Sequence, residues 1–241
     1  MFAGPNGSGK TTLFRALARE YSRYGVFRGG PFVNADDVEA ELTKGRLDLS
    51  HFGIRIDGYE LNSWLSRNAW GPAANTLTQA LELIGPKVYA KQRIEAPYAA
   101  AMLTTWLRER LLEEGISFSF ETVMSHPSKV GFLAKARKLG YRTYLYFVAT
   151  AAVDINVGRV QVRKQLGEHA VPESKIRERY TRSIALLPDA IRNADRSYLF
   201  DNSGQRHVLV AELNGVDLVS SPAKRDGIPS WADRALQELG C

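Results

Sequence analysis

A chain of 241 residues with 44% hydrophobic residues can bury one substantial core, which excludes an intrinsically disordered chain and favours a single α/β domain. The net charge of +6 fits binding of nucleic acid or of a polyanionic nucleotide, and charge alone does not separate the two. The sequence has a single cysteine, Cys241, which excludes a disulfide scaffold. It has no signal peptide and no run of about eighteen apolar residues, which excludes a membrane span, so we expect a cytoplasmic protein.

The chain opens with a phosphate-binding motif. Residues 4–11 read Gly-Pro-Asn-Gly-Ser-Gly-Lys-Thr, which matches GxxxxGK[ST], and a helical pattern follows. In such a loop the backbone N–H groups surround the phosphates, Lys10 reaches the β- and γ-phosphates, and the Thr11 hydroxyl faces Mg²⁺. The sequence therefore predicts a nucleoside triphosphate with Mg²⁺. The residues expected to hold it are Gly4, Pro5, Asn6, Gly7, Ser8, Gly9, Lys10, Thr11 and Thr12.

The rest of the chain alternates between strand and helix patterns. The strand before the motif has at most residues 1–3, which indicates a short first strand or a chain that starts late. We expect strands at 31–34, 117–120, 143–150, 197–200 and 207–213, and helices at 11–24, 98–114, 127–139 and 231–239.

Two further segments break this regular alternation. An insertion of about 48–95 carries Gly-Pro pairs and is expected to hold short helical pieces at 59–67 and 75–83. A basic helical region spans 156–193 and is interrupted at 167–172. The whole pattern predicts a P-loop NTPase fold of the kinase type, in one domain over 1–241. This three-layer fold has a central, mostly parallel sheet, a helical insertion and a basic helical lid.

The motif alone does not choose among GTPases, transport ATPases, helicases and kinases. The sequence has no NKxD to read guanine, no LSGGQ-like signature, and no apolar strand that ends in Asp-Glu or Asp-Asp. A kinase that phosphorylates a small molecule is therefore the leading interpretation.

Two carboxylates follow predicted strands, at the edge where open α/β sheets bind ligands. Asp36 follows the strand at 31–34 and can act either as the general base for an acceptor hydroxyl or as a helix N-cap. Glu121 follows the strand at 117–120 and should point into the same crevice, because a charge at this position is costly unless it is used or paired.

Arginines of the basic region form two helix faces. Arg159 and Arg163 are four residues apart, and Arg179 and Arg182 are three apart, so each pair shares a face. The two faces can close on the triphosphate as a lid, or they can be solvated faces paired with glutamates of the same region.

Five blocks occur together in one family order: 3–12 around the motif, Val-Asn-Ala-Asp at 33–36, Phe-Ser-Phe-Glu-Thr at 118–122, 167–172, and Phe-Asp-Asn-Ser-Gly at 200–204. On these blocks the chain resembles the zeta-toxin family of P-loop kinases, and more closely its chromosomal branch of predicted ATPases. The resemblance implies a bacterial phosphotransferase that moves the γ-phosphate of ATP to a hydroxyl of a UDP-activated amino sugar. It further implies the toxin of a toxin–antitoxin pair.

The resemblance also implies roles for individual residues. Lys10 would bind phosphates, Asp36 would be the general base, and Glu121, with Thr122 beside it, would contact the substrate. Arg163 matches the first lid arginine.

Two more positions follow from the resemblance. The second lid position is His169 here, so Arg179 or Arg182 is expected to substitute. Residues 201–204, with Asn202, would lie near the adenine. The insertion, which the resemblance does not cover, can wall the acceptor pocket and change the acceptor.

Two other interpretations stay open. The chain can be a nucleotide-gated ATPase or binding module that acts through a protein partner, with the insertion as its docking surface. Direct nucleic-acid binding by the basic helices is disfavoured, because the sequence has neither an RNP-like aromatic pair nor zinc-ligand spacing.

Overall fold

The computed structural model describes residues 1–23, 29–69, 74–91, 96–166, 171–222 and 227–241. Contacts within the chain form two compact units, residues 1–27 with 121–241 and residues 28–120, which are described here one at a time. The prediction of a single domain stays a prediction.

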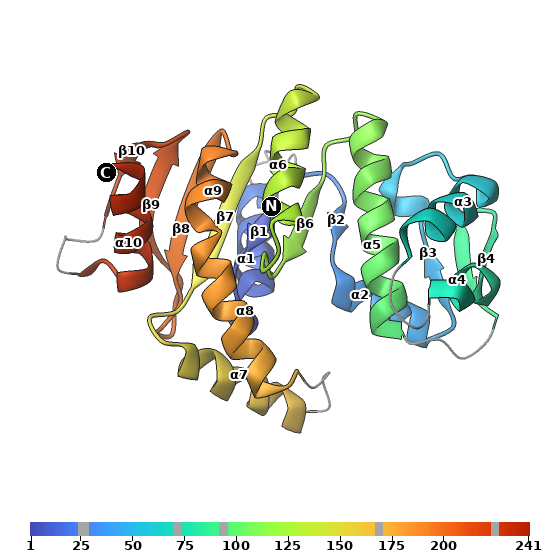
Figure 1. Ribbon diagram of the computed structural model, residues 1–241, viewed down its shortest axis with the longest axis horizontal. Helices are drawn as coiled ribbons and strands as arrows, with labels where there is room; N and C mark the ends of the chain where they lie inside the picture. Colours follow the sequence, from blue (N-terminus) through green and yellow to red (C-terminus); the bar gives the residue numbers. More distant parts are fainter. Residues whose placement is uncertain (24–28, 70–73, 92–95, 167–170, 223–226) are drawn as a thin grey trace. The chain divides into compact units, whose positions relative to one another are not determined.

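The first unit contains a mostly parallel sheet with the strand order β10–β9–β8–β7–β1–β6 (Figure 1). Strands β9 and β10 run antiparallel to their neighbours, and the others are parallel. The first two residues of β6 belong to the second unit and pair there with β2. The strands are β1 (Phe2–Ala3), β6 (Ser119–Thr122), β7 (Tyr144–Ala149), β8 (Arg196–Asp201), β9 (Val208–Asn214) and β10 (Asp217–Ser220).

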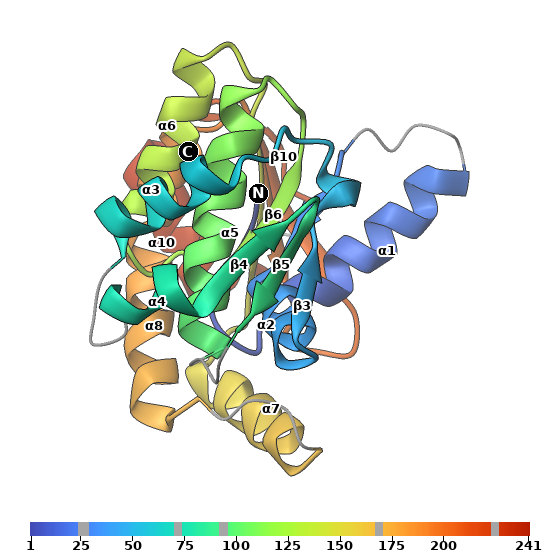
Figure 2. The ribbon, with the colours of Figure 1, turned by 90° about the vertical axis from the view of Figure 1, so that its right-hand side faces the viewer.

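Helices cover both faces of this sheet. Helix α1 lies on one face, and α6, α9 and α10 lie on the other, as Figures 1 and 2 show from two directions. The α/β fold class expected from the sequence is therefore confirmed. The helices of the first unit are α1 (Lys10–Arg23), α6 (Ser128–Lys138), α7 (Val153–Gln165), α8 (Glu173–Ala185), α9 (Leu187–Arg192) and α10 (Ser230–Leu239).

The first strand has only two residues, in line with the short strand expected from the sequence, yet aromatic side chains pack around it. The ring of Phe2 stacks on Tyr146 of β7 at 4.8 Å between centroids, and Tyr146 stacks on Tyr198 of β8 at 5.1 Å. Phe14 of α1 meets Phe2 edge-on at 5.2 Å. These contacts hold both ends of the loop that joins β1 to α1.

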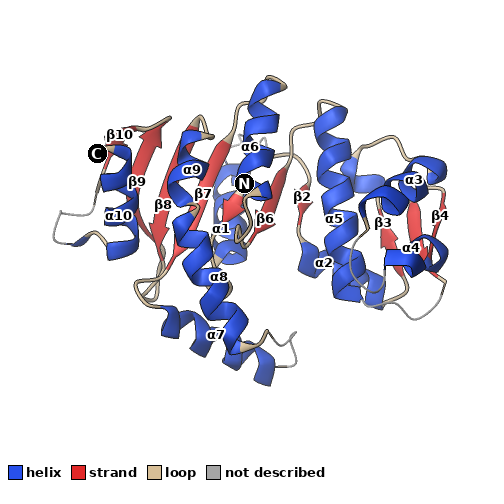
Figure 3. Ribbon diagram, viewed as in Figure 1, coloured by secondary structure: helices blue, strands red, loops and turns tan. Residues whose placement is uncertain are grey.

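The second unit contains a small antiparallel sheet, β3–β5–β4, and helices (Figure 3). Its longest helix, α5, is apolar along much of its length and buries Leu103, Trp106 and Leu107. The elements are β2 (Phe32–Val33), α2 (Ala35–Thr43), β3 (Arg46–Asp48), a 3₁₀ turn (Ser50–Phe52), α3 (Gly58–Asn68), α4 (Ala74–Ala80), β4 (Leu81–Ile84), β5 (Lys87–Ala90) and α5 (Ala96–Glu113).

The prediction of a purely helical insertion was wrong. Helix α3 confirms the piece expected at 59–67, but the helix expected at 75–83 ends at Ala80, where β4 begins. Gly85 adopts a φ of 56°, which permits the turn between β4 and β5. The segment then forms a hairpin that buries Leu81 and Val88, so tertiary packing overrides a helix-compatible pattern.

Two smaller expectations at the sheet also change. Glu121 and Thr122 lie inside β6 instead of after it, because the strand is displaced by two residues from the range expected. Strand β10 was not predicted, since all four of its residues are exposed and it lies at the sheet edge. Among the described ranges, every helix is too short or too polar to cross a bilayer.

Candidate nucleotide-binding site

The phosphate-binding motif forms the loop between β1 and α1. Gly4, Gly7 and Gly9 have φ angles of 138°, 74° and 95°, a region that strains any residue with a Cβ atom. A Cβ on Gly4 would lie 2.0 Å from the carbonyl oxygen of Val148, and one on Gly7 would lie 2.8 Å from that of Asn156. Glycine is therefore required by backbone shape and by close packing at the same positions.

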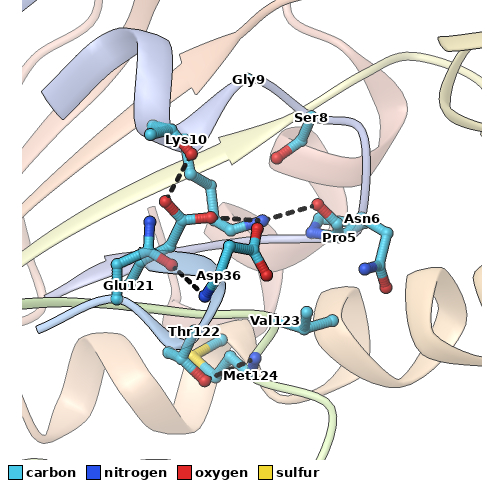
Figure 4. Close-up of polar contacts among 12 residues, drawn as sticks. Pro5, Asn6, Ser8, Gly9, Lys10, Asp36, Glu121, Thr122, Val123 and Met124 are labelled. Carbon is cyan, nitrogen blue, oxygen red and sulfur yellow. Dashed lines mark hydrogen bonds and ion pairs between the residues drawn. The ribbon is translucent and has the colours of Figure 1, made fainter. Parts of the chain in front are cut away.

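A lysine, a threonine and a carboxylate meet at the start of α1. The Lys10 side chain is 5% exposed, and its Nζ donates to the Pro5 carbonyl at 2.9 Å and lies 3.6 Å from Glu121 Oε1 (Figure 4). Thr11 Oγ1 donates to Glu121 Oε2 at 2.6 Å. The pairing of Phe2 with Glu121 between β1 and β6 brings this carboxylate under the loop.

Two side chains of the loop contain a buried polar atom that has no hydrogen bond among the described residues. The Ser8 hydroxyl belongs to a fully buried side chain, and it points to the side of the loop where the Lys10 ammonium lies (Figure 4). The Asn6 Oδ1 atom is buried and lacks a partner in the same way. A buried polar group without a partner costs free energy, and such groups at one loop indicate a place for a polar ligand.

Three backbone carbonyls of the loop contact side chains from far along the sequence. Asn202, which follows β8, donates through Nδ2 to the Ser8 carbonyl at 2.7 Å. Asn156 of α7 donates to the Asn6 carbonyl, and His207 lies against the Gly9 carbonyl. Sequence analysis missed Asn156 and His207, because nothing in their local sequence marks them as neighbours of the motif.

Thr122 and Thr12 differ from the other predicted site residues. Thr122 is buried and its hydroxyl accepts a hydrogen bond from the Met124 backbone N–H at 3.2 Å, so it shapes the turn after β6, where Met124 has a φ of 53°. Thr12 lies in the first turn of α1 with an exposed side chain.

The basic helices α7 and α8 form a hairpin whose arginines fall into two groups. Arg177 pairs with Asp154 at 2.6 Å and with Glu173 at 2.8 Å, and Arg182 pairs with Glu178 at 2.7 Å. For these two the solvated-face interpretation holds.

The two arginines expected to act as the lid are in a different situation. Arg163 and Arg179 are half-buried, and no carboxylate of the described residues lies within ion-pairing distance of Arg163. Their lid role stays a prediction. His169 lies outside the described residues.

Asp36 belongs to the second unit. It lies in the first turn of α2, it is exposed, and its backbone N–H donates to the side chain of Asn34 at 2.9 Å. Asn34 is therefore the N-cap, and the alternative that gave this role to Asp36 was wrong. The assignment of Asp36 as general base stays a prediction.

Fold and site together define an α/β protein with a glycine-rich phosphate-binding loop between β1 and α1. No family model and no curated protein matches the sequence. Among solved structures, the chain is similar to one in the AvrRxo1-ORF1:AvrRxo1-ORF2 complex with sulphate ions, with a TM-score of 0.54 and 17% identity over 95% of this chain. It spans 63% of the length of that chain.

A second solved structure is similar over 99% of this chain and 86% of its own, with a TM-score of 0.47 and 13% identity. It belongs to the PezAT chromosomal toxin–antitoxin system of Streptococcus pneumoniae. At such identities a structural likeness shows the fold, and the activity is a separate question.

Proposed function

We propose that the protein is an ATP-dependent phosphotransferase of zeta-toxin type. It transfers the γ-phosphate of ATP to a hydroxyl of a small acceptor, of which a UDP-activated amino sugar is the leading candidate. The observation that carries the proposal is the phosphate loop, where the buried Lys10 ammonium and the buried Ser8 hydroxyl lie on the same side of a glycine-rich backbone.

The residues present fit a triphosphate with Mg²⁺. The loop from Gly4 to Gly9 offers backbone N–H groups at the N-terminus of α1, where the helix dipole favours an anion. The Ser8 hydroxyl, which has no partner among the residues that the structure describes, can donate to a phosphate oxygen. Mg²⁺, held by Thr11 and the phosphates, would neutralise charge on the transferred group.

Glu121 organises the two side chains that face the phosphates. Because the Thr11 hydroxyl donates its hydrogen bond to Glu121, the lone pairs of Thr11 Oγ1 are available to a cation. The same carboxylate lies 3.6 Å from Lys10 Nζ and balances its buried charge. Binding of the triphosphate then requires Lys10 to exchange the Pro5 carbonyl for phosphate oxygens.

The transfer step assigns Asp36 as general base. The acceptor oxygen forms a bond to the γ-phosphorus, its proton passes to the Asp36 carboxylate, and the bond from that phosphorus to the β–γ bridging oxygen breaks to release ADP. Arg163, with Arg179 as the second lid cation, would stabilise the negative charge that spreads over the transferred oxygens.

An antitoxin protein is the proposed partner. This part of the proposal rests on the sequence resemblance to zeta toxins. It gains support from the similar solved structure, which contains AvrRxo1-ORF1 together with AvrRxo1-ORF2.

The test is a transfer assay with γ-labelled ATP, Mg²⁺ and a panel of UDP-sugars and nucleotide cofactors, with Lys10→Ala as the blank. Label on one acceptor, absent from the blank, supports the phosphotransferase and identifies its substrate class. Label released only as inorganic phosphate, whatever the acceptor, contradicts it and favours a nucleotide-gated module that acts through a protein partner.

A further inference from the structure

Three backbone carbonyls of the phosphate loop accept hydrogen bonds from side chains outside it. Asn156 Nδ2 donates to the Asn6 carbonyl at 2.5 Å, and Asn202 Nδ2 donates to the Ser8 carbonyl at 2.7 Å. His207 Nε2 lies 3.1 Å from the Gly9 carbonyl.

We propose that Asn156, Asn202 and His207 are positioning residues that hold the phosphate loop in the shape that binds a triphosphate; the inference rests on the proposed function. We call them the loop brace. They come from α7, from the residue after β8 and from the residue before β9, so the brace joins three parts of the first unit to one short loop.

The physical reason lies in the direction of the peptide groups. An anion is bound by N–H groups that converge on it, and a carbonyl turned inward would repel it. Glycines at positions 4, 7 and 9 make the backbone flexible, so the loop by itself populates many conformations. Donors that hold the carbonyls of residues 6, 8 and 9 in fixed directions remove those conformations before the ligand arrives.

The brace residues are themselves fixed. Asn156 is fully buried, and its Oδ1 accepts a hydrogen bond from the Thr150 hydroxyl, which sets the amide with Nδ2 toward the loop. Asn202 is 8% exposed, and its Nδ2 lies 2.3 Å from where a Cβ on Gly9 would be. The Asn202 amide is therefore packed closely against both Ser8 and Gly9 of the loop.

His207 acts as a donor to the Gly9 carbonyl when the ring carries its proton on Nε2. Burial lowers the pKa of the His207 imidazole, and the nearby Arg159 guanidinium lowers it further, while the bond to Gly9 acts in the opposite direction. The ring is thus neutral near pH 7, and a glutamine, whose amide is also a neutral donor, can replace it.

This role differs from the one that the resemblance gave to Asn202. A residue at the adenine affects ATP and ADP but not inorganic tripolyphosphate. A brace residue affects all three ligands, because it acts through the phosphate loop.

The experiment measures the dissociation constants of ADP and of inorganic tripolyphosphate by calorimetry, at a temperature where circular dichroism shows each variant folded. The variants are Asn202→Leu, His207→Leu and His207→Gln. The control is Thr143→Val, which removes a buried hydroxyl bonded to Asp195 before β7, away from the loop.

We expect Asn202→Leu and His207→Leu to raise the dissociation constants of both ligands about tenfold, because each variant loses a buried hydrogen bond. The His207→Gln and Thr143→Val variants should bind both ligands like the wild type. Weaker binding of ADP alone in Asn202→Leu, or unchanged binding of both ligands in the two leucine variants, overturns the brace while the proposed function stands. If the wild type binds neither ligand, the brace and the proposed function both fall.

Discussion

The phosphate loop and the small sheet of the second unit differ in what they bury. Around the loop the chain buries polar side chains, including Ser8, Lys10, Asn156 and Asn202. Among its described residues, the segment from β3 to β5 buries only apolar side chains: Leu47, Leu49, Phe52, Ile54, Leu61, Leu65, Leu77, Ala80, Leu81 and Val88.

This difference fits the ligand site that we propose at the loop and a purely structural role for the small sheet. Polar groups are costly to bury, and the loop carries that cost together with the Ser8 hydroxyl and the Asn6 Oδ1 atom, which have no hydrogen-bond partner among the described residues. A core of aliphatic side chains stabilises its own unit and offers little chemistry.

The largest effect is expected at Lys10. We expect Lys10→Ala to lower the rate of phosphate transfer by on the order of 10³, because it removes a buried cation from the phosphates. The control is Lys91→Ala, since Lys91 is an exposed lysine that pairs with Glu82 at 3.2 Å in the second unit. Equal rates in the two variants would show that buried charge at the loop has no chemical role.

Asp36 lies in the second unit, yet the proposed function gives it a chemical role as general base. We expect Asp36→Asn to keep ATP affinity and to lower kcat by on the order of 10², the usual scale for a general base. Asp37→Asn is a matched control, because both aspartates lie exposed in the first turn of α2. A loss of the same size in both variants would point to the helix terminus and against a base.

Glu121 tests how the metal site is organised. We expect Glu121→Gln to raise the Mg²⁺ concentration for half-maximal activity by about 10- to 100-fold, since the carboxylate orients the Thr11 hydroxyl. Glu212→Gln serves as the control, because Glu212 lies on β9 and pairs with Arg196 of β8. An unchanged Mg²⁺ requirement in Glu121→Gln would leave this carboxylate with the substrate contact implied by the family resemblance.

Leu65 tests the other side of the contrast. We expect Leu65→Ala to lower the free energy of unfolding of the second unit by about 2–5 kcal/mol, because the side chain is fully buried. The affinity of Leu65→Ala for tripolyphosphate should equal that of the wild type. In the control Ser66→Ala, at an exposed site, both the free energy of unfolding and this affinity should stay unchanged. Denaturant titration and calorimetry measure the two, and a parallel loss of affinity would break the separation of roles.

The smallest effect concerns pH and His207. Because burial depresses the pKa of this imidazole in the folded state, the unfolded chain binds more protons just below the unfolded pKa. The stability that the neutral ring contributes is therefore present above that pKa and is lost as the pH falls through the folded value. Thermal melts from pH 7.5 to 5 should show a weaker decline in His207→Gln than in the wild type, and identical declines would exclude this group.

Sequence alone predicted the features that depend on local pattern. The glycines, Lys10 and Thr11 belong to one short motif, so the position of the loop between β1 and α1 could be predicted. The parallel sheet followed from alternating strand and helix patterns.

What the sequence did not predict depends on contacts across the chain. The meeting of Glu121 with Lys10 and Thr11 requires the pairing of β1 with β6, which the linear order does not state. Asn156 and His207 reach the loop from about 150 to 200 residues away and carry no motif of their own. In the insertion, the hairpin β4–β5 competes with a helix in a short apolar segment, and packing decides between them.

Calorimetric titration of ATP with Mg²⁺ into the wild type and Lys10→Ala, with tripolyphosphate as competitor, tests whether the loop binds a triphosphate. We expect one binding site in the wild type, from which tripolyphosphate displaces ATP, and an affinity at least about a hundredfold weaker in the variant, because a buried charged contact is lost. Equal affinity in both proteins, or ATP binding that tripolyphosphate does not displace, would contradict a triphosphate site at this loop.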